Sequence, residues 1–213
     1  MNRKLVRKFK MSRLAWGLAA LVSTQLLSGC FPLLMGGAVM GGMVAVDRRT
    51  SGTQLEDQSI ELKGINRIHE ATGNGRGHIS ITSYNRVVLL TGEATTEADR
   101  TAAENAVKQI ENVRNVVNEL AVMEASTVGS RSSDTVLTSK VKASFVDAAD
   151  LQATAIKVVT ERGVVHLMGR VTEREATRAA EVARGVSGVK KVVRVFDMIS
   201  ETELANLHAP TQK

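Results

Sequence analysis

The chain repeats itself at a spacing of 77 residues, and this duplication constrains its fold more than any other feature. The segment from Val87 to Gly92 aligns with the segment from Val164 to Gly169, and both are short apolar stretches that end in glycine. An Ala-Ala-Glu triplet follows each segment at the same spacing. A repeat of this length predicts two copies of one structural unit, each a small domain.

Each copy has the same order of predicted elements: a helix with apolar residues four apart, a hairpin of alternating strands, a second helix and a closing valine-rich strand. These are the helix at 60–68, the turn at 84–86, the helix from Thr95 and the strand 113–122 in the first copy, and 137–145, 161–163, the helix from Thr172 and 189–198 in the second. The sequence therefore predicts an α+β fold of two tandem α-β-β-α-β domains, each a three-stranded mixed sheet packed on two helices.

The second helix of each copy is predicted to lie close to its sheet, because its buried stripe is mostly alanine. The predicted stripes are Ala98, Ala102, Ala106 and Ile110, and then Ala176, Ala180, Ala183 and Val186. In the second copy, Thr172 and Glu175 also have the spacing of a capping box.

The N-terminal region has the features of a secretory signal peptide. Six basic residues lie before Leu14, an uncharged apolar run follows, and Leu27-Ser28-Gly29-Cys30 closes it. This ending resembles the lipobox of bacterial lipoproteins. The resemblance implies cleavage before Cys30, a diacylglyceryl thioether on its sulfur, and acylation of the new amino group with palmitate or a similar fatty acid. Because Phe31 rather than aspartate follows the cysteine, the resemblance favours the outer membrane.

An uncleaved membrane span is the alternative for this region, since no charge occurs from Leu14 to Val46. Pro32 and two Gly-Gly pairs interrupt that run, and a span would leave Cys30 without a role. A merely buried cysteine is the weakest alternative. Synthesis begins at Met1 or Met11, and the sequence does not decide between them.

Two domains behind a lipobox resemble a known family. The α-β-β-α-β order, the strand that ends in glycine and the capped alanine-rich helix resemble the BON domain, most specifically from Gly163 to Ala176. The whole arrangement resembles the dual-BON-domain outer-membrane lipoproteins of the DolP type. That resemblance implies association with phospholipid, support of outer-membrane integrity, a periplasm-facing location and no enzymatic activity.

The predicted boundaries follow from these assignments. They are a signal peptide at 1–29, a lipidated glycine-rich tether at 30–56, a first domain at 57–124, a linker at 125–133, a second domain at 134–199 and a mobile tail at 200–213.

The charge of the chain is unevenly distributed. Six of the 28 basic residues precede Cys30, which leaves 22 basic and 22 acidic residues from Cys30 onward. A neutral chain with few aromatic residues does not favour nucleic-acid binding. The range 57–124 carries ten acidic and seven basic residues, whereas 134–199 carries eight and eleven. The second domain is thus the better candidate for an anionic membrane, although such differences also occur as ordinary surface variation.

The first helix of the second copy is the predicted phospholipid-binding surface. If Leu137 points to the core, Val136 and Lys140 share another face, and an N-cap at Ser133 or Asp134 would leave amide donors free for a phosphate. The predicted site residues are Asp134, Thr135, Val136, Leu137 and Lys140. The resemblance places its lipid contact on the same helix, but with a bulky aromatic residue in place of Val136. A solvated helix face with one stray valine is the alternative.

The sequence predicts no catalytic residue, metal site, cofactor or small-molecule substrate. The four histidines are scattered without ligand spacing, and His166 is expected to be a partly buried, hydrogen-bonded strand residue. The leading hypothesis is therefore a non-enzymatic protein that binds an anionic phospholipid membrane. The alternative is a periplasmic scaffold that binds an envelope protein or a cell-wall component.

Overall fold

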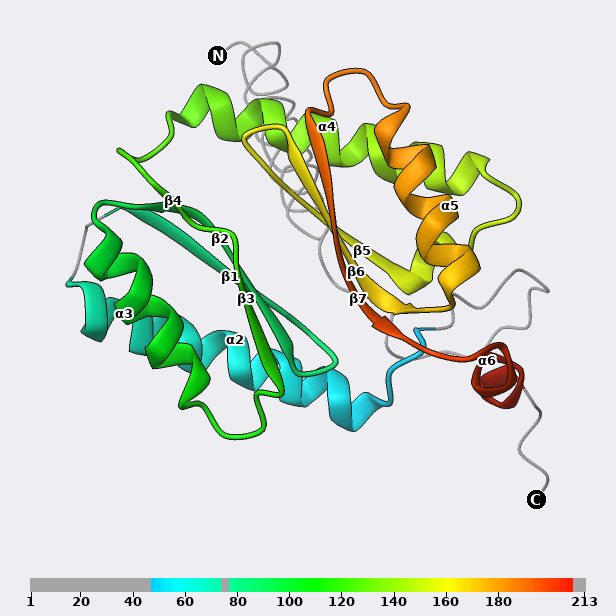
Figure 1. Ribbon diagram of the computed structural model, residues 1–213, viewed down its shortest axis with the longest axis horizontal. Helices are drawn as coiled ribbons and strands as arrows, with labels where there is room; N and C mark the ends of the chain where they lie inside the picture. Colours follow the sequence, from blue (N-terminus) through cyan, green and yellow to red (C-terminus); the bar gives the residue numbers. More distant parts are fainter. Residues whose placement is uncertain (1–46, 74–76, 209–213) are drawn as a thin grey trace, which may run out of the picture. The chain divides into compact units, whose positions relative to one another are not determined.

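The computed structural model describes residues 47–73 and 77–208, so Cys30 and the predicted signal peptide lie outside it (Figure 1). The first domain contains α2 (Ser51–Thr72), β1 (His78–Tyr84), β2 (Val87–Ala94), α3 (Glu97–Lys108), β3 (Asn115–Asn118) and β4 (Ala121–Val122). The second contains α4 (Val128–Asp147), the short 3-10 helix η2 (Ala153–Ala155), β5 (Ile156–Glu161), β6 (Val164–Val171), α5 (Glu173–Arg184) and β7 (Lys191–Met198), and α6 (Glu201–His208) follows. This order confirms the predicted α+β fold.

Both sheets are mixed, with an antiparallel hairpin and a parallel closing strand. The second has the order β5-β6-β7, and the first has the order β1-β2-β3 with β4 also paired to β2. The first sheet has four strands rather than three because its closing strand breaks after Asn118. There the backbone N–H of Leu120 donates to Asn118 Oδ1 at 3.1 Å, and the Leu120 side chain is buried in the core.

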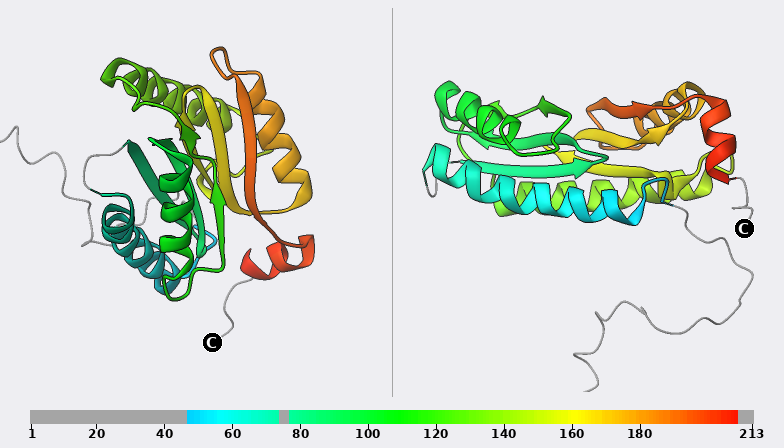
Figure 2. Two further views of the ribbon diagram at one scale, coloured as in Figure 1. Left: turned by 60° about the vertical axis from the view of Figure 1, so that its left-hand side comes forward. Right: turned by 90° about the horizontal axis from the view of Figure 1, so that it is seen from below.

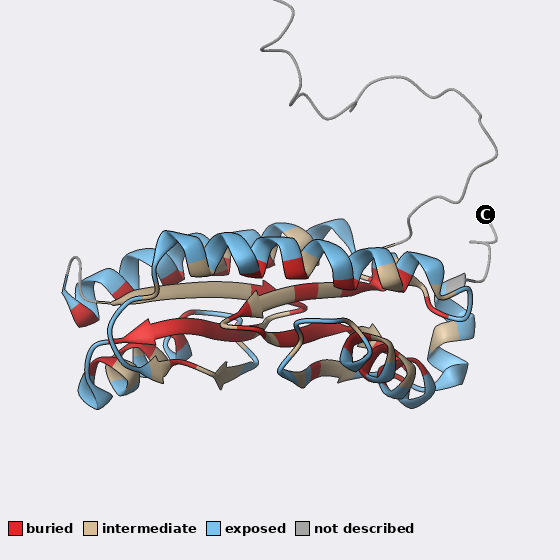
Figure 3. Ribbon diagram, turned by 90° about the horizontal axis from the view of Figure 1, so that it is seen from above, coloured by how far each residue is buried: buried red, intermediate tan, exposed pale blue. Residues whose placement is uncertain are grey.

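Both helices of each domain lie on one face of its sheet (Figure 2). The buried residues gather on the strands and on the helix sides that face them (Figure 3). In the first domain, Gly64 of α2 lets the helix approach β1 closely, because a Cβ at this position would lie 2.2 Å from Ile81 Cδ1. The core residues of the first domain include Ile60, Ile68, Val88, Leu90, Ala103 and Val107, and those of the second include Val141, Phe145, Val165, Leu167, Ala176 and Ala183.

The alanine stripe predicted for α5 is confirmed at Ala176, Ala180 and Ala183, and Thr172 with Glu175 forms the predicted capping box. Of the stripe predicted for the second helix of the first copy, Ile110 is buried, whereas Ala98 is exposed and Ala102 and Ala106 are only partly buried. Thr96, one residue later than predicted, caps this helix, so the buried positions are Asp99, Ala103 and Val107. A shift of one residue rotates a helix face by about 100°, which turns Ala98 outward.

A third apolar cluster joins the two domains. It contains residues on the strand faces that point away from the helices, so the two sheets meet face to face between their helical layers. Its buried members are Tyr84, Leu89, Met168 and Val195, and Val87, Val117, Val159 and Val193 pack against them. The two domains are therefore joined by an apolar core that is separate from the core inside each domain.

Helices occupy parts of the predicted tether, linker and tail. The first turns of α2 occupy 51–56 of the predicted tether, and the first turns of α4 occupy 128–133 of the predicted linker. The predicted mobile tail contains α6, whose Glu203 pairs with Arg170. Within residues 47–73 and 77–208, no helix combines the length and the apolar character that a membrane span requires.

Candidate functional site

The helix that carries the predicted site, α4, begins earlier than expected. Its N-cap is Thr127, whose side chain accepts a hydrogen bond from the backbone N–H of Ser130 at 3.2 Å. The predicted N-cap at Ser133 or Asp134 was therefore wrong. Val136 and Lys140 lie in the middle of α4, so the uncapped amides of a helix end are not beside them.

Asp134 is buried and its carboxylate holds the turn between β5 and β6. Its Oδ2 accepts from the backbone N–H of Arg162 and its Oδ1 from that of Gly163, both at 2.8 Å. The matching residue of the first domain, Asp57, binds the turn between β1 and β2 in the same way. The structure therefore places Asp134 in the architecture of the turn.

A groove of about 630 Å³ runs beside α4, and four of the five predicted residues line it, including Asp134. The Val136 side chain is 55% exposed on its wall, Lys140 lies one turn further along, and Leu137 is buried beneath. The opposite wall comes from the turn at Arg162 and Gly163 and from the loop before β7.

That opposite wall contributes Lys190, which the sequence analysis missed. The Lys190 side chain lies over Gly163, where its Cδ is 3.1 Å from the position that a Cβ would occupy. Gly163 also has a φ of 77°, so a side chain there would be strained as well as crowded. The groove thus brings together two lysines that are 50 positions apart, and no periodicity in the sequence connects them.

Both groove lysines are available to an anion. Within the described part of the chain, neither Lys140 nor Lys190 forms an ion pair, and serine hydroxyls from 130, 133 and 187 line the same groove. Arg162 differs, because its Nη1 donates to Glu93 Oε1 and to the Gly92 carbonyl, each at 2.8 Å. The arrangement can bind a phosphate through mobile ammonium groups and hydroxyls.

Thr135 lies on another side of α4, away from the groove. Its Oγ1 donates to the Arg131 carbonyl at 3.0 Å, and its side chain lines a second, smaller pocket. Four of the five predicted residues therefore line the groove, namely Asp134, Val136, Leu137 and Lys140, and Thr135 does not.

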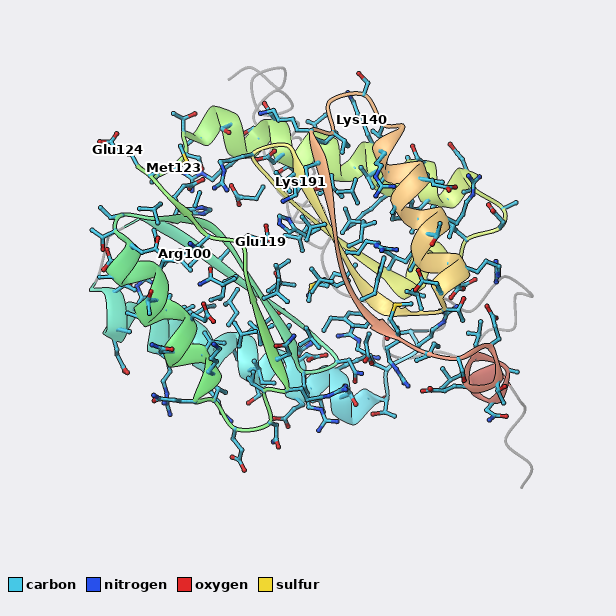
Figure 4. The ribbon with its side chains drawn as sticks, viewed as in Figure 1. Arg100, Glu119, Met123, Glu124, Lys140 and Lys191 are labelled. Atoms are coloured by element: carbon cyan, nitrogen blue, oxygen red, sulfur yellow. The ribbon has the colours of Figure 1, made fainter. Side chains whose placement is uncertain are left out.

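The corresponding helix of the first domain presents a different surface. At the repeat spacing, Ser59 of α2 takes the place of Val136, while Lys63 takes the place of Lys140. Among the labelled residues, Arg100, Glu119, Met123 and Glu124 belong to the first domain, and Lys140 and Lys191 to the second (Figure 4). At this pair of matched positions, the exposed apolar side chain one turn from a lysine therefore occurs in the second domain and not in the first.

The two domains both match one protein family, and the chain has relatives over most of its length. The BON domain model matches residues 56–124 and 133–199. The chain is 37% identical over 175 residues to the outer membrane lipoprotein DolP of Haemophilus influenzae, a match that covers 82% of this chain and 91% of that protein. It is 36% identical over 155 residues to a 21 kDa hemolysin of Actinobacillus pleuropneumoniae, covering 72% and 80%. It is 30% identical over 144 residues to the osmotically-inducible protein Y of Escherichia coli, covering 66% and 72%.

Proposed function

The protein belongs to the BON-domain family, with two copies of the domain, and we propose that it is a lipid-anchored, non-enzymatic envelope protein that binds anionic phospholipid through its second domain. The predicted resemblance to this family is confirmed. A relative in Haemophilus influenzae is an outer membrane lipoprotein. Together with the lipobox that ends at Cys30, this relative supports an outer-membrane anchor, with the domains in the periplasm and a role in envelope integrity.

The groove beside α4 is the observation that carries the proposal. Lys140 and Lys190 both line this groove, and the exposed Val136 lines it with them. A lysine close to an anionic membrane contributes about 1 kcal/mol of binding free energy. A valine beside it can enter the boundary between head groups and acyl chains. Two further exposed valines of α4, Val128 and Val146, extend the apolar surface of the helix.

The net charges of the two domains also favour a membrane contact made by the second domain. The second domain has three more basic than acidic residues, and the first has three more acidic than basic ones. The second domain also holds the start of the described chain, because Arg48 is buried there against Glu175. The next residue, Arg49, pairs with Asp57 of the first domain, so the described chain begins in contact with both domains.

Vesicle binding by residues 47–208 tests the proposal. This fragment keeps Arg48 and its ion pair, which a shorter fragment would lose. We expect it to bind vesicles of phosphatidylcholine with one quarter phosphatidylglycerol, and to bind pure phosphatidylcholine at least tenfold more weakly. Changing Lys140→Glu and Lys190→Glu together should weaken binding to the anionic vesicles at least tenfold, because two favourable charges become repulsive.

Lys63→Glu is the matched control, since Lys63 lies at the position of α2 that corresponds to Lys140. We expect this variant to bind as the unchanged fragment does. Equal binding by the double variant, or equal loss in the control, would contradict a site in the groove.

A scaffold function is the second candidate, and the exposed face of α2 favours it. Leu55, Leu62 and Ile65 are 66%, 66% and 45% exposed and lie on one side of this helix. They belong to the acidic domain, which an anionic membrane repels, so a protein is the better occupant of this face. Retention of envelope proteins that Leu62→Glu abolishes, together with an absence of vesicle binding, would favour the scaffold over the lipid-binding function.

A further inference from the structure

Three potential metal ligands meet on the other side of α4 from the groove. His78 begins β1, Glu93 lies near the end of β2, and Glu161 ends β5. The Nδ1 or Nε2 atom of the histidine and one oxygen of each carboxylate all lie within 4.8 Å of one another. The first two residues belong to the first domain and the third to the second, so only the packed pair of domains assembles the cluster.

Two atoms of this cluster lack partners although they are buried. Glu161 is 7% exposed, and its Oε1 has no hydrogen-bond partner among the described residues. His78 Nδ1 is likewise buried without a hydrogen bond, at 3.7 Å from Glu93 Oε2. Buried polar atoms are nearly always paired, because an unpaired one costs about 1–3 kcal/mol. A ligand that accepts both lone pairs would remove this cost.

The surrounding charges favour a cation as that ligand. The carboxylate of Glu93 lies beside that of Glu161, and Asp134 lines the same pocket, so acidic groups gather at this point. Two cations also face the cluster, Arg162 and Arg131, but Arg162 is already bound to Glu93 Oε1 at 2.8 Å. Glu161 itself receives no direct ion pair from either arginine within residues 47–73 and 77–208.

A pocket of about 190 Å³ connects the cluster to solvent. His78 and Glu161 line it together with Arg131, Thr135 and Thr138. Such a pocket offers an entry path and space for a water molecule as a further ligand. Two hydrogen bonds hold the Glu93 carboxylate in place: Arg162 donates to its Oε1, and the backbone N–H of Ser126 donates to its Oε2 at 3.0 Å. The carboxylate oxygen Oε2 still has a lone pair for a metal.

We propose that His78, Glu93 and Glu161 bind a divalent transition metal of the zinc class, and that the metal joins the two domains. One imidazole nitrogen and two carboxylates are a typical set of zinc ligands, with a water in the fourth position. Ligand atoms of tetrahedral zinc lie about 3.4 Å apart, given bonds of about 2.1 Å. The distance of 3.7 Å from His78 Nδ1 to Glu93 Oε2 needs only a small adjustment to reach that value.

Titration of Zn²⁺ into the metal-free full-length protein tests the site. Calorimetry should show one binding event per chain, and Co²⁺ should give the visible absorption of a four-coordinate site. His78→Ala and, separately, Glu161→Gln should each weaken Zn²⁺ binding at least tenfold, because each removes one of three protein ligands. Glu161→Gln nearly preserves the side-chain shape, so it keeps the test valid if His78→Ala disturbs the fold.

His69→Ala provides the matched control, since His69 is an exposed histidine of α2 that does not belong to the cluster. We expect this variant to bind Zn²⁺ as the unchanged protein does. The proposal is overturned if the unchanged protein binds no Zn²⁺, or if the Glu161→Gln variant binds it with unchanged affinity. Vesicle binding is a separate measurement, so failure of the metal site would leave the phospholipid proposal untouched.

Discussion

Asp57 and Asp134, which lie 77 positions apart, bind the hairpin turns of their respective domains in the same way. Each carboxylate accepts hydrogen bonds from two consecutive backbone N–H groups, those of Asn85 and Arg86 or those of Arg162 and Gly163, all at 2.8 Å. The four turn residues have positive φ angles between 50° and 77°, which non-glycine residues seldom adopt. The buried carboxylates therefore stabilise tight turns that the chain would otherwise form at a cost.

We predict that Asp57→Ala destabilises the fold more than Asp134→Ala does. Asp57 also accepts from Ser83 Oγ at 2.7 Å and pairs with Arg49 at 2.8 Å, so its loss leaves more buried groups without a partner. The expected losses of unfolding free energy are about 3–5 kcal/mol for Asp57→Ala and about 2 kcal/mol for Asp134→Ala. Urea denaturation followed by circular dichroism measures both values, and equal losses would contradict the ranking.

The close approach of α2 to β1 leads to a second prediction. A Cβ at position 64 would lie 2.2 Å from Ile81 Cδ1, and the cost of this clash is partly offset by the roughly 1 kcal/mol that alanine gains over glycine in a helix, so Gly64→Ala should destabilise the first domain by up to about 2 kcal/mol. Ile81→Val removes the clashing methyl group. In the Gly64→Ala background this second change should restore part of the loss, whereas alone it should cost about 0.5–1.5 kcal/mol. Additive losses in the double variant, measured by urea denaturation, would contradict a direct clash.

The buried ion pair of Arg48 leads to a third prediction. Its guanidinium donates to both carboxylate oxygens of Glu175, at 2.7 and 2.8 Å, and to the Arg170 carbonyl at 2.7 Å. Burial alone would raise the pKa of Glu175, but the hydrogen bonds from Arg48 and from the Thr172 backbone outweigh it and lower the pKa. Arg48→Met should therefore cost about 3–5 kcal/mol, because it leaves a buried carboxylate without its cation.

Two further variants check the cause of that loss. Glu175→Gln in the Arg48→Met background should recover part of the stability, since no buried charge remains. Arg178→Met is the control, because the pair of Arg178 with Asp150 is exposed and should contribute less than about 1 kcal/mol. Urea denaturation of the unchanged protein and these three variants measures the losses, and equal losses at Arg48 and Arg178 would contradict the role assigned to burial.

A fourth prediction concerns pH. His166 is 2% exposed and, contrary to the sequence analysis, neither of its ring nitrogens has a hydrogen bond among the described residues. Burial lowers its pKa below the ordinary value of 6.5, although Glu119 at 3.8 Å opposes the shift. The unfolded chain therefore takes up this proton first as pH falls, so stability should decrease below about pH 6.5.

His166→Leu isolates this contribution, because leucine is the residue at the corresponding position of the first domain, Leu89. Urea midpoints at pH 7.5 and pH 5.5 should differ less in this variant than in the unchanged protein. The same difference in both proteins would show that other groups cause the pH dependence.

The element order could be predicted from the sequence because its signals are local. Helical spacing of Leu137, Val141 and Phe145, the polar turns and the capping box at Thr172 each depend on a few neighbouring residues. The N-cap of α4 was mispredicted because Ser133 and Asp134 both suit a cap, and only packing shows that Asp134 turns inward. The break of the closing strand after Asn118 was missed for the same reason, because it depends on the burial of Leu120 in the core.

The amino-acid sequence by itself determined that this protein consists of two copies of an α-β-β-α-β unit behind a predicted lipid attachment site, and which helix carries Lys140 and Val136. Tertiary structure alone decided which side chains share a site. It brought Lys190 to Lys140 across the groove, and it brought His78 of the first domain to Glu161 of the second. These meetings depend on how faces of distant segments pack, and local periodicity contains no information about that packing.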